Sequence, residues 1–358
     1  MKRFVYLVVV AVLAVFFAAC KDDRICGTPG TFPGFSLSPV GFPVSYDKLG
    51  AFFIDTRTLG VGNLLWKGPW RDDAADGSDA GNVPARATQL SQQGKTDCFA
   101  TEFVFQWRSG SALWIGVPSN TSQDWRNIEA KNRFLQMLRM FVSVERPSIL
   151  FLGNENDFYY EQDLLDYANW LQFYNDTYDE LKKILPGVSI GPVFNFEHLS
   201  GSGTLRGWIR PFWEAFDHHD FKRVDVVGLT VYPFFKYPIP SEIPATYLDS
   251  FVKRLTDAAT AAKRTISLAI TETGWPAENL GDPNPPWVAS AQQQTNYIPK
   301  FVDMIQGKQL LFYNWLFLYA MADDGSADWK TFGSISLHDS AGIKRQAYDI
   351  WYDTWRPK

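Results

Sequence analysis

The stretch ISLAITETGWP, residues 266–276, contains the pattern that decides the fold. Its first six residues, Ile266–Thr271, form a short apolar run with several β-branched side chains, which predicts a buried strand. A glutamate, Glu272, follows at once. The stretch ILFLGNE, residues 149–155, repeats this arrangement and also ends on a glutamate. Each stretch therefore predicts a buried strand with an acidic side chain at its carboxyl end.

Eight short apolar runs along the chain are typical of strands. They are Phe35–Val40, Val61–Trp66, Phe103–Trp107, Ile149–Gly153, Val188–Phe194, Val224–Val231, Ile266–Thr271 and Leu310–Leu318. Amphipathic segments lie between the runs. In the clearest of them, residues 164–185, apolar side chains recur every three or four positions until Pro186-Gly187 ends the pattern.

Eight alternations of strand and helix predict an α/β fold, a (β/α)8 TIM barrel. We expect one domain over residues 34–358, because no later linker divides the chain. About 40 residues fall to each strand–helix unit, against roughly 31 in a barrel of about 250 residues, so we expect enlarged loops. A doubly wound open sheet is the alternative, but no glycine-rich phosphate loop follows an early strand.

The two glutamates fit the fourth and seventh strands of such a barrel. Glu155 and Glu272 are 117 positions apart, which is three units of about 39 residues. The carboxyl ends of all barrel strands meet at one face, where the chemistry of this fold takes place. Two carboxyl groups that converge there suit glycoside hydrolysis, in which one protonates the leaving oxygen and the other attacks the anomeric carbon or activates water.

Three motifs at these strand ends resemble the clan A glycoside hydrolases, which are TIM-barrel enzymes. Residues 153–155 (GNE) resemble their acid/base motif, residues 272–276 (ETGWP) their nucleophile motif, and residues 225–234 (DVVGLTVYPF) their sixth strand. The nearest local similarity is to the family 53 endo-β-1,4-galactanases and the family 17 endo-β-1,3-glucanases. The resemblance implies that Glu155 is the general acid/base and Glu272 the nucleophile of a retaining mechanism.

The same resemblance implies four substrate-binding or positioning residues. Tyr232 would hydrogen-bond the nucleophile, and Asn154 would hold a substrate hydroxyl. Trp315 would form the floor of the sugar site, and Trp275 would extend it. Many members also carry an arginine on the second strand, for which Arg71 and Arg108 are the candidates here.

Other patterns allow two interpretations each. Five further tryptophans can stack on a sugar or pack in the core: Trp66, Trp70, Trp107, Trp114 and Trp287. Glu197-His198, after the fifth strand, is interpreted as lining the cleft. The sequence Asp217-His218-His219-Asp220 lacks the spacing of a zinc site and is interpreted as a solvated turn. We expect no metal and no organic cofactor.

The amino terminus predicts export. Residues 1–19 combine a cationic start with an apolar run, and they end on small residues before Cys20, as in the lipobox of bacterial lipoproteins. Cys20 would carry the lipid that holds the protein to a membrane, and residues 20–33 would form a tether; a single membrane anchor is the alternative. Cys26 and Cys98 either form a disulfide or are two buried thiols.

Composition sets limits on the partners. The 358 residues carry a formal charge of −5 and no basic stripe, which argues against nucleic acid. Aromatic residues make up 16% of the chain, and we expect some of them to face a ligand. The sequence therefore predicts a monomeric, lipid-anchored, retaining endo-β-glycosidase acting on an extracellular or periplasmic β-galactan or β-glucan. The alternatives are a surface glycan-binding lipoprotein without turnover and a transglycosylase.

Overall fold

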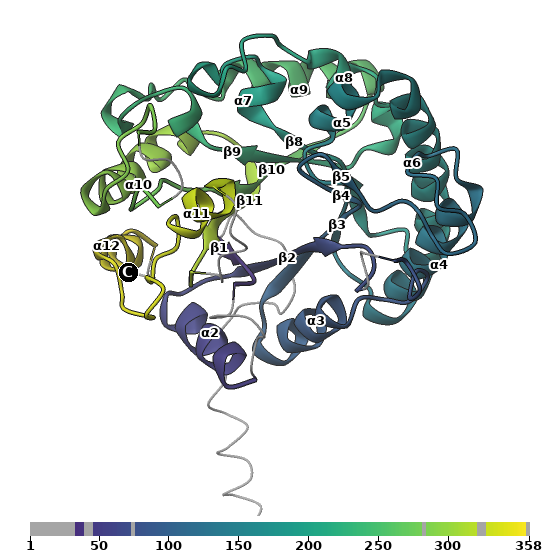
Figure 1. Ribbon diagram of the computed structural model, residues 1–358, viewed down its shortest axis with the longest axis horizontal. Helices are drawn as coiled ribbons and strands as arrows, with labels where there is room; N and C mark the ends of the chain where they lie inside the picture. Colours follow the sequence, from purple (N-terminus) through teal and green to yellow (C-terminus); the bar gives the residue numbers. More distant parts are fainter. Residues whose placement is uncertain (1–32, 39–45, 73–75, 281–283, 321–326, 356–358) are drawn as a thin grey trace, which may run out of the picture.

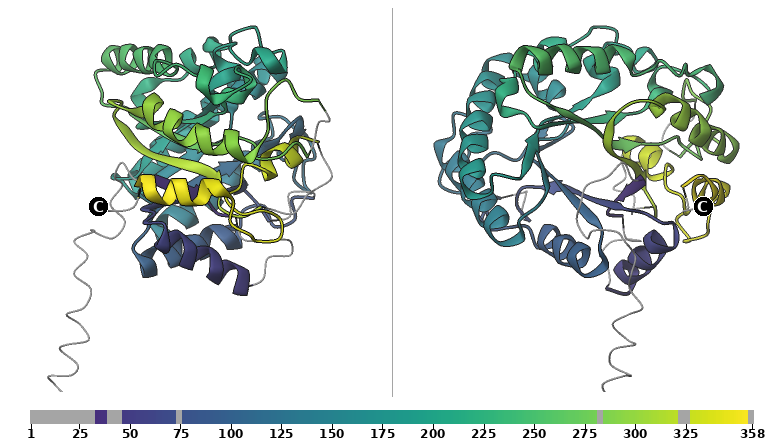
Figure 2. Two further views of the ribbon diagram at one scale, coloured as in Figure 1. Left: turned by 90° about the vertical axis from the view of Figure 1, so that its left-hand side faces the viewer. Right: turned by 180° about the vertical axis from the view of Figure 1, so that it is seen from behind.

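The protein is a barrel of parallel strands enclosed by a ring of helices (Figure 1). The view from behind in Figure 2 shows the same ring, and the side view shows helices along the flank of the strands. The computed structural model describes residues 33–38, 46–72, 76–280, 284–320 and 327–355. The predicted signal peptide, residues 1–19, and the tether with Cys20 lie outside these residues, except Pro33, which begins β1.

The strands of the barrel are β1 (Pro33–Ser36), β2 (Asn63–Pro69), β3 (Ala100–Gln106), β6 (Ile149–Leu152), β7 (Ser189–Gly191), β8 (Val193–Asn195), β9 (Val226–Val231), β10 (Ser267–Thr273) and β11 (Leu310–Phe317). A small separate hairpin is formed by β4 (Arg108–Ser109) and β5 (Ala112–Leu113). Each of the eight predicted runs overlaps a barrel strand, so the predicted (β/α)8 fold is confirmed.

A proline divides the fifth barrel strand and shows how the sheet closes. The order of the sheet is β7-β6-β3-β2-β1-β11-β10-β9-β8. Its two ends, β7 and β8, are separated in the chain only by Pro192. Pro192 has no N–H to donate to a ladder, but its carbonyl accepts from Gly228 N at 2.9 Å. The divided strand therefore pairs with β6 through one half and with β9 through the other, which closes the barrel.

Every barrel strand is followed by at least one helix, if β7 and β8 are counted as one divided strand. The helices are α2 (Tyr46–Thr58), α3 (Ala85–Asp97), α4 (Ile128–Glu145), α5 (Asn156–Gln162), α6 (Leu164–Ile184), α7 (Phe196–Leu199), α8 (Trp213–Asp217), α9 (Asp249–Ala262), α10 (Ala291–Ile305), α11 (Ala327–Gly333) and α12 (Gln346–Trp355). Side-chain caps fix several helix starts: Asn127 accepts from Ala130 N at α4, and Asp163 accepts from Asp166 N at α6.

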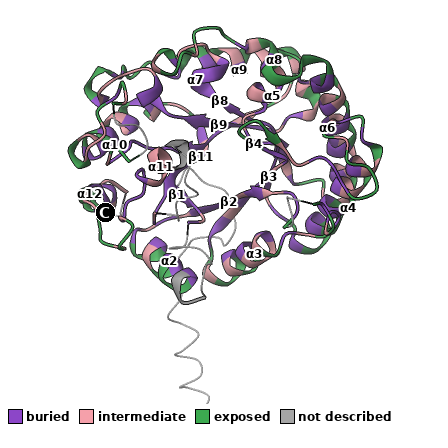
Figure 3. Ribbon diagram, in the orientation of Figure 1, coloured by how far each residue is buried: buried purple, intermediate pink, exposed green. Residues whose placement is uncertain are grey.

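Two apolar clusters hold the layers together. One fills the barrel and draws its residues from nearly every strand: Leu65, Val104, Ile149, Phe151, Val193, Val226, Ala269 and Phe312. The other lies between the strands and the helices, where Phe103 and Phe105 of β3 both contact Phe141 of α4. Figure 3 shows the outcome, with buried strands at the centre and exposed residues along the outer helices.

The predicted lipid anchor and the predicted disulfide both involve residues near the amino terminus that lie outside the described ranges. No helix within the described residues has the length and apolar character needed to cross a membrane. Cys98 is disulfide-bonded. The other two cysteines, Cys20 and Cys26, lie outside the described residues, so the pairing of Cys26 with Cys98 is still a prediction.

The closure of the barrel depends on a glycine next to Pro192. A β-carbon at position 191 would lie 1.5 Å from the Val226 carbonyl oxygen, so backbone would have to move. We expect Gly191→Ala to lower the free energy of unfolding by about 3 kcal/mol in urea denaturation. Gly187→Ala, where a β-carbon would meet nothing within 4 Å, should stay within about 1 kcal/mol. Equal stability of the two variants would contradict this account of the closure.

Candidate active site

A pocket of about 310 Å³ opens at the carboxyl ends of the strands and holds both predicted glutamates. Its lining comes from seven barrel strands or the residues directly after them, from the β4–β5 hairpin and from α11. The residues are Ser36, Leu37, Lys67, Gly68, Pro69, Gln106, Arg108, Ser109, Gly110, Asn154, Glu155, Tyr232, Glu272, Leu316, Phe317 and Phe332. The convergence predicted for Glu155 and Glu272 is therefore present in the fold.

Glu155 is aimed into the pocket by a tight turn after β6. Gly153 and Glu155 both have positive φ, 79° and 50°. A β-carbon at position 153 would lie 2.2 Å from Asn156 Oδ1, so only glycine fits this close approach. Glu155 itself adopts the left-handed conformation, which costs a residue other than glycine about 1 kcal/mol or more. Its side chain makes no capping hydrogen bond to α5 and lines the pocket instead.

Glu272 reaches the pocket because β10 contains a bulge. The pairing of β10 with β9 shifts between Ile270 and Glu272, so two residues of β10 stand opposite one residue of β9. A bulge of this kind reverses which side chains face inward beyond it. Thr273 consequently faces outward and contacts the Tyr297 hydroxyl of α10 at 2.5 Å. Glu272, one position earlier, faces the pocket and is buried.

Two hydroxyl groups of one strand hold the two carboxylates. The Thr230 hydroxyl donates to Glu155 Oε1 at 2.7 Å, and the Tyr232 hydroxyl donates to Glu272 Oε2 at 2.5 Å. Thr230 and Tyr232 are two positions apart, so their α-carbons are about 7 Å apart along extended chain. The predicted contact between Tyr232 and Glu272 is present, and a single strand sets the spacing of the carboxyl pair.

The cation beside Glu272 is a lysine that sequence reasoning missed. Lys67 Nζ lies 2.5 Å from Glu272 Oε1. The predicted second strand ended at Trp66, whereas β2 continues to Pro69. Lys67 therefore belongs to the strand and follows Leu65 on its inward face. A strand boundary placed three residues later would have identified Lys67 as the second-strand cation.

The two candidate arginines have different positions. Arg71 is buried, donates to the Gly116 carbonyl at 2.5 Å and does not line the pocket. Arg108 lines the pocket from β4, and its guanidinium donates to the backbone carbonyls of Glu155 and Gly110, the former at 3.3 Å. Arg108 therefore braces the turn that carries Glu155 and does not contact Glu272 through any hydrogen bond found among the described residues.

The two carboxyl groups differ in their electrostatic surroundings. Burial raises the pKa of the Glu155 carboxyl above its usual range, and the charge of Glu272 raises it further. Glu272 instead receives a hydrogen bond from the Tyr232 hydroxyl and pairs with the Lys67 ammonium. This arrangement suits one protonated and one charged carboxyl group in a shared pocket.

Asn154, predicted to bind substrate, lines the pocket beside Glu155. Its side-chain oxygen Oδ1 is buried and has no hydrogen-bond partner within the described part of the chain. A buried amide oxygen without a partner is costly, which leaves it available to accept a hydrogen bond from a ligand hydroxyl.

The prediction that Trp315 and Trp275 form the floor of the pocket is wrong, since both are fully buried and neither lines it. Phe312 and Leu316 of β11 point into the barrel, so Trp315 points outward and packs against Trp351 of α12. The Trp315 indole donates to the Ile335 carbonyl at 2.8 Å, and that of Trp275 donates to the Val288 carbonyl at 2.9 Å.

The apolar wall of the pocket is formed by other side chains, namely Leu316, Phe317 and Phe332. Four of the further tryptophans are buried in the core: Trp66, Trp70, Trp107 and Trp287. Only Trp114 among the five is partly exposed. The aromatic surplus of the sequence is therefore mostly core packing.

Two other interpretations are also corrected. Glu197 and His198 do not line the pocket but are buried behind it, in α7. Burial raises the pKa of Glu197 to about 8. His219, expected in a solvated turn, is buried against the Tyr167 hydroxyl at 3.1 Å, and burial lowers its pKa to about 3. Within the described residues, no group of three His, Cys, Asp or Glu side chains is placed to hold a metal ion.

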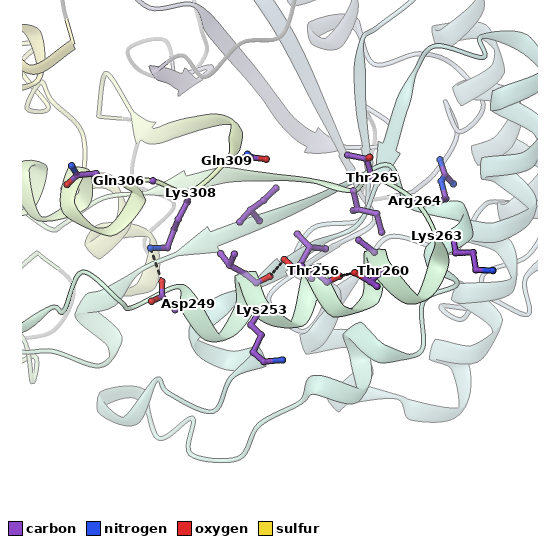
Figure 4. Close-up of a pocket in the computed structure, with 16 residues that line it drawn as sticks. Asp249, Lys253, Thr256, Thr260, Lys263, Arg264, Thr265, Gln306, Lys308 and Gln309 are labelled. Carbon is purple, nitrogen blue, oxygen red and sulfur yellow. Dashed lines mark hydrogen bonds and ion pairs between the residues drawn. The ribbon is translucent and has the colours of Figure 1, made fainter.

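A larger groove, of about 1070 Å³, lies elsewhere on the molecule (Figure 4). It is lined by α9 and by residues 264–266 and 306–309, which precede β10 and β11. It therefore opens at the amino ends of these strands, opposite the face that carries chemistry in this fold. Figure 4 shows its one lining carboxylate, Asp249, paired with Lys308. The carboxyl pair, and not the size of the cavity, identifies the candidate active site.

Comparison with solved structures supports the fold. A glycoside hydrolase of family 39 from Bacteroides cellulosilyticus WH2 covers 92% of this chain and 64% of its own, with a TM-score of 0.63 and 15% identity. The exo-β-1,4-mannosidase Op5Man5 from Opitutaceae bacterium strain TAV5 covers 92% and 61%, with a TM-score of 0.62 and 13% identity. A β-glucuronidase from Bifidobacterium dentium covers 92% and 47%, with a TM-score of 0.59 and 10% identity.

The chain thus spans less than two thirds of the length of these three proteins. At such identities the similarity shows the barrel fold. No protein-family model matches the chain, and no curated protein matches it in sequence. Activity has to be argued from the site.

The proximity of the two carboxyl groups can be tested without a substrate. In Glu272→Gln, the charge that raises the pKa of Glu155 is absent. We therefore expect the pKa of Glu155 to fall, measured by ¹³C NMR titration of the labelled carboxyl group. Glu129→Gln, which alters a surface pair with Arg133, is the control and should leave this pKa unchanged. An unchanged pKa in Glu272→Gln would show that the carboxyl groups do not share a pocket.

Proposed function

We propose that this protein is a retaining endo-β-glycosidase that hydrolyses a polysaccharide by double displacement. The observation that carries the proposal is the pair of glutamates in one pocket, where the pKa of Glu155 is raised by burial and Glu272 is paired with Lys67. The similarity to solved glycoside hydrolases supports it at the level of the barrel. The motifs at residues 153–155 and 272–276 support it at the level of the site.

In the first step a Glu272 oxygen attacks the anomeric carbon while the bond from that carbon to the leaving oxygen breaks. Glu155 gives its proton to the leaving oxygen, so the first product departs as an alcohol. In the second step the Glu155 carboxylate takes a proton from water, and the water oxygen displaces Glu272 from the anomeric carbon. The product keeps its anomeric configuration, and both glutamates return to their starting states.

The neighbours of Glu272 fit the role of a nucleophile. Lys67 and Tyr232 hold one carboxylate oxygen each, at 2.5 Å in both cases. These two contacts restrict the rotation of the carboxyl group, so that attack needs little reorganisation. As Glu272 becomes an ester its negative charge disappears, and the same two donors then favour its release as a carboxylate in the second step.

The proposed substrate class is a β-galactan or a β-glucan, from the local similarity to families 53 and 17. The apolar wall of Leu316, Phe317 and Phe332 offers a surface for the C–H face of a pyranose ring. Asn154 Oδ1 offers an acceptor for a sugar hydroxyl.

Activity on polysaccharides tests the proposal. The chain of residues 21–358, which keeps both Cys26 and Cys98, is incubated with β-galactans, β-1,3-glucans and mannans, and the products are resolved by size and anomeric form. We expect one polymer to be cleaved with retention, and Glu272→Gln and Glu155→Gln to reduce turnover by at least about 10²-fold through loss of nucleophile and proton donor. Glu129→Gln is the matched control. Inverted products would refute double displacement, and retained turnover in Glu272→Gln would remove it as the nucleophile.

We also propose that the protein is exported and anchored through lipid on Cys20, as the pattern of residues 1–20 predicts. Cys20→Ser removes the thiol that would carry the lipid. In cells we expect this variant to leave the membrane fraction, whereas Cys26→Ser stays in it. If the Cys20→Ser protein remained in the membrane fraction after cleavage of residues 1–19, the anchor would lie elsewhere.

A further inference from the structure

His198 is a buried titratable group that the proposed mechanism does not use. It belongs to α7, which lies beside α5 and next to the end of β8 (Figure 1). Its side chain is 1% exposed. The imidazole is stacked between the rings of Phe158 and Phe212, with centroids 3.9 and 4.5 Å away. These contacts fix the plane of the ring, in which both nitrogens lie within hydrogen-bond distance of acidic side chains.

Both ring nitrogens of His198 face carboxylate oxygens of α5. Nδ1 lies 2.7 Å from Asp157 Oδ2, and Nε2 lies 3.0 Å from Glu161 Oε2. An ionised carboxylate only accepts hydrogen bonds, so donation to both carboxylates at once requires hydrogen on both nitrogens, which is the imidazolium form. Burial alone would lower the pKa of His198, but the hydrogen bonds and charges of Asp157 and Glu161 outweigh it and raise the pKa.

A chain of hydrogen bonds connects this imidazolium to Glu155. Asp157, held by His198 through Oδ2, accepts at Oδ1 from the Asn195 backbone N–H at 2.8 Å. The Asn195 amide donates to Glu155 Oε1 at 3.0 Å, and its Oδ1 accepts from the backbone N–H of His198 at 3.0 Å. Asn195 is therefore fixed through its backbone and its side chain, and the imidazole acts on it through Asp157, which holds the Asn195 backbone N–H.

The charged groups around the imidazole are few. Asp157 and Glu161 come from α5, and no other titratable group contacts its nitrogens among the described residues. Three arginines lie beyond the aromatic side chains that surround it. The guanidinium carbon of Arg108 lies 5.3 Å from the ring centroid of Phe158. That of Arg206 lies 5.8 Å from the Trp208 ring, and that of Arg210 lies 5.1 Å from the Phe212 ring. Glu161 is the outer partner, with a side chain that is 53% exposed.

We propose that His198 is a positioning residue for Glu155: as an imidazolium it clamps Asp157, and Asp157 and His198 together hold the Asn195 amide against the Glu155 carboxyl group. Loss of one proton leaves the ring a single N–H, which cannot donate to Asp157 and Glu161 at once, so the clamp is weakened. The inference rests on the proposed function for its effect on turnover, but its effect on Glu155 is independent of any substrate.

The sign of the pH effect follows from these contacts. Because the partners raise the pKa of His198, the clamp is fully present below the ordinary histidine value of about 6.5 and is lost as pH rises through the raised value. The hydrogen bond from Asn195 favours the ionised form of Glu155 and lowers its pKa. Opening the clamp therefore raises the pKa of Glu155.

NMR on the full-length chain in detergent tests the clamp. The sequence has four histidines, so ¹⁵N-histidine labelling with His198→Gln assigns the ring. We expect both His198 nitrogens to be protonated at pH 7, and Glu161→Gln to lower the pKa of His198. In His198→Gln we expect the pKa of Glu155, read from its ¹³C carboxyl signal, to rise, whereas His219→Gln leaves it unchanged. A neutral His198 at pH 7 would overturn the proposal.

A double-variant comparison separates positioning from a simple charge effect. In an Asn195→Ala background, His198→Gln should no longer change the pKa of Glu155, because the amide that transmits the effect is absent. An unchanged effect in that background would mean that the imidazolium acts on Glu155 only through space, and would refute the positioning role. If Asn195→Ala failed to fold, Glu161→Gln would still test the clamp, because it changes only one exposed side chain.

Kinetics then separate this inference from the proposed function. On the polymer that the protein cleaves, we expect Glu161→Gln to move the alkaline limb of kcat, which reports the proton of Glu155, to higher pH by the rise seen in the pKa of Glu155, with an unchanged plateau. His198→Gln should lower kcat by about 10- to 100-fold with KM nearly unchanged. If His198→Gln changes the pKa of Glu155 in NMR but no polymer is cleaved, the proposed function is refuted and the positioning role of His198 is supported. If the protein is active but neither the pKa of Glu155 nor the alkaline limb of kcat changes in these variants, the positioning role of His198 is refuted.

Discussion

Thr230 and Tyr232 lie two positions apart at the carboxyl end of β9, and each donates its hydroxyl hydrogen to one of the two carboxylates. The rest of the site depends on this constraint. An extended chain fixes the spacing of alternate side chains, so two carboxylates bound to two such hydroxyls are kept at a defined separation. A barrel is needed to bring the partners there, because Glu155 follows β6 and Glu272 ends β10, on either side of β9 in the ring.

Local departures from regular structure then turn each carboxylate inward. Glu155 stands in a left-handed turn, and Glu272 follows the irregularity in β10. Both features cost conformational energy, and the surrounding barrel holds them in place. Their surroundings differ in charge as well: Glu155 is desolvated next to a like charge, whereas Glu272 has Lys67 against it. The fold thus produces two chemically different carboxyl groups from one residue type.

Much of the fold and of the carboxyl pair could be predicted from sequence, because strand periodicity and the glutamate spacing are local or regular signals. Lys67 was missed because its recognition depends on where β2 ends. The motif around Trp315 predicts a pocket residue, but the inward and outward alternation of β11 turns this side chain toward α12. The environment of His198 was not predictable, since its partners come from α5 and from the end of β8, and only tertiary structure brings them together.

The central claim is that Glu272 forms a covalent bond to the sugar while Glu155 acts as the general acid and then as the general base. The most direct measurement is intact-mass and peptide mass spectrometry after incubation with aryl 2-deoxy-2-fluoro-β-glycosides of gluco, galacto and manno configuration, whose intermediates break down slowly. The account predicts one sugar added per chain, esterified to Glu272, with inactivation in step with labelling. Labelling of another residue, or turnover of a β-glycan that no probe of the matching sugar can inactivate, would contradict it.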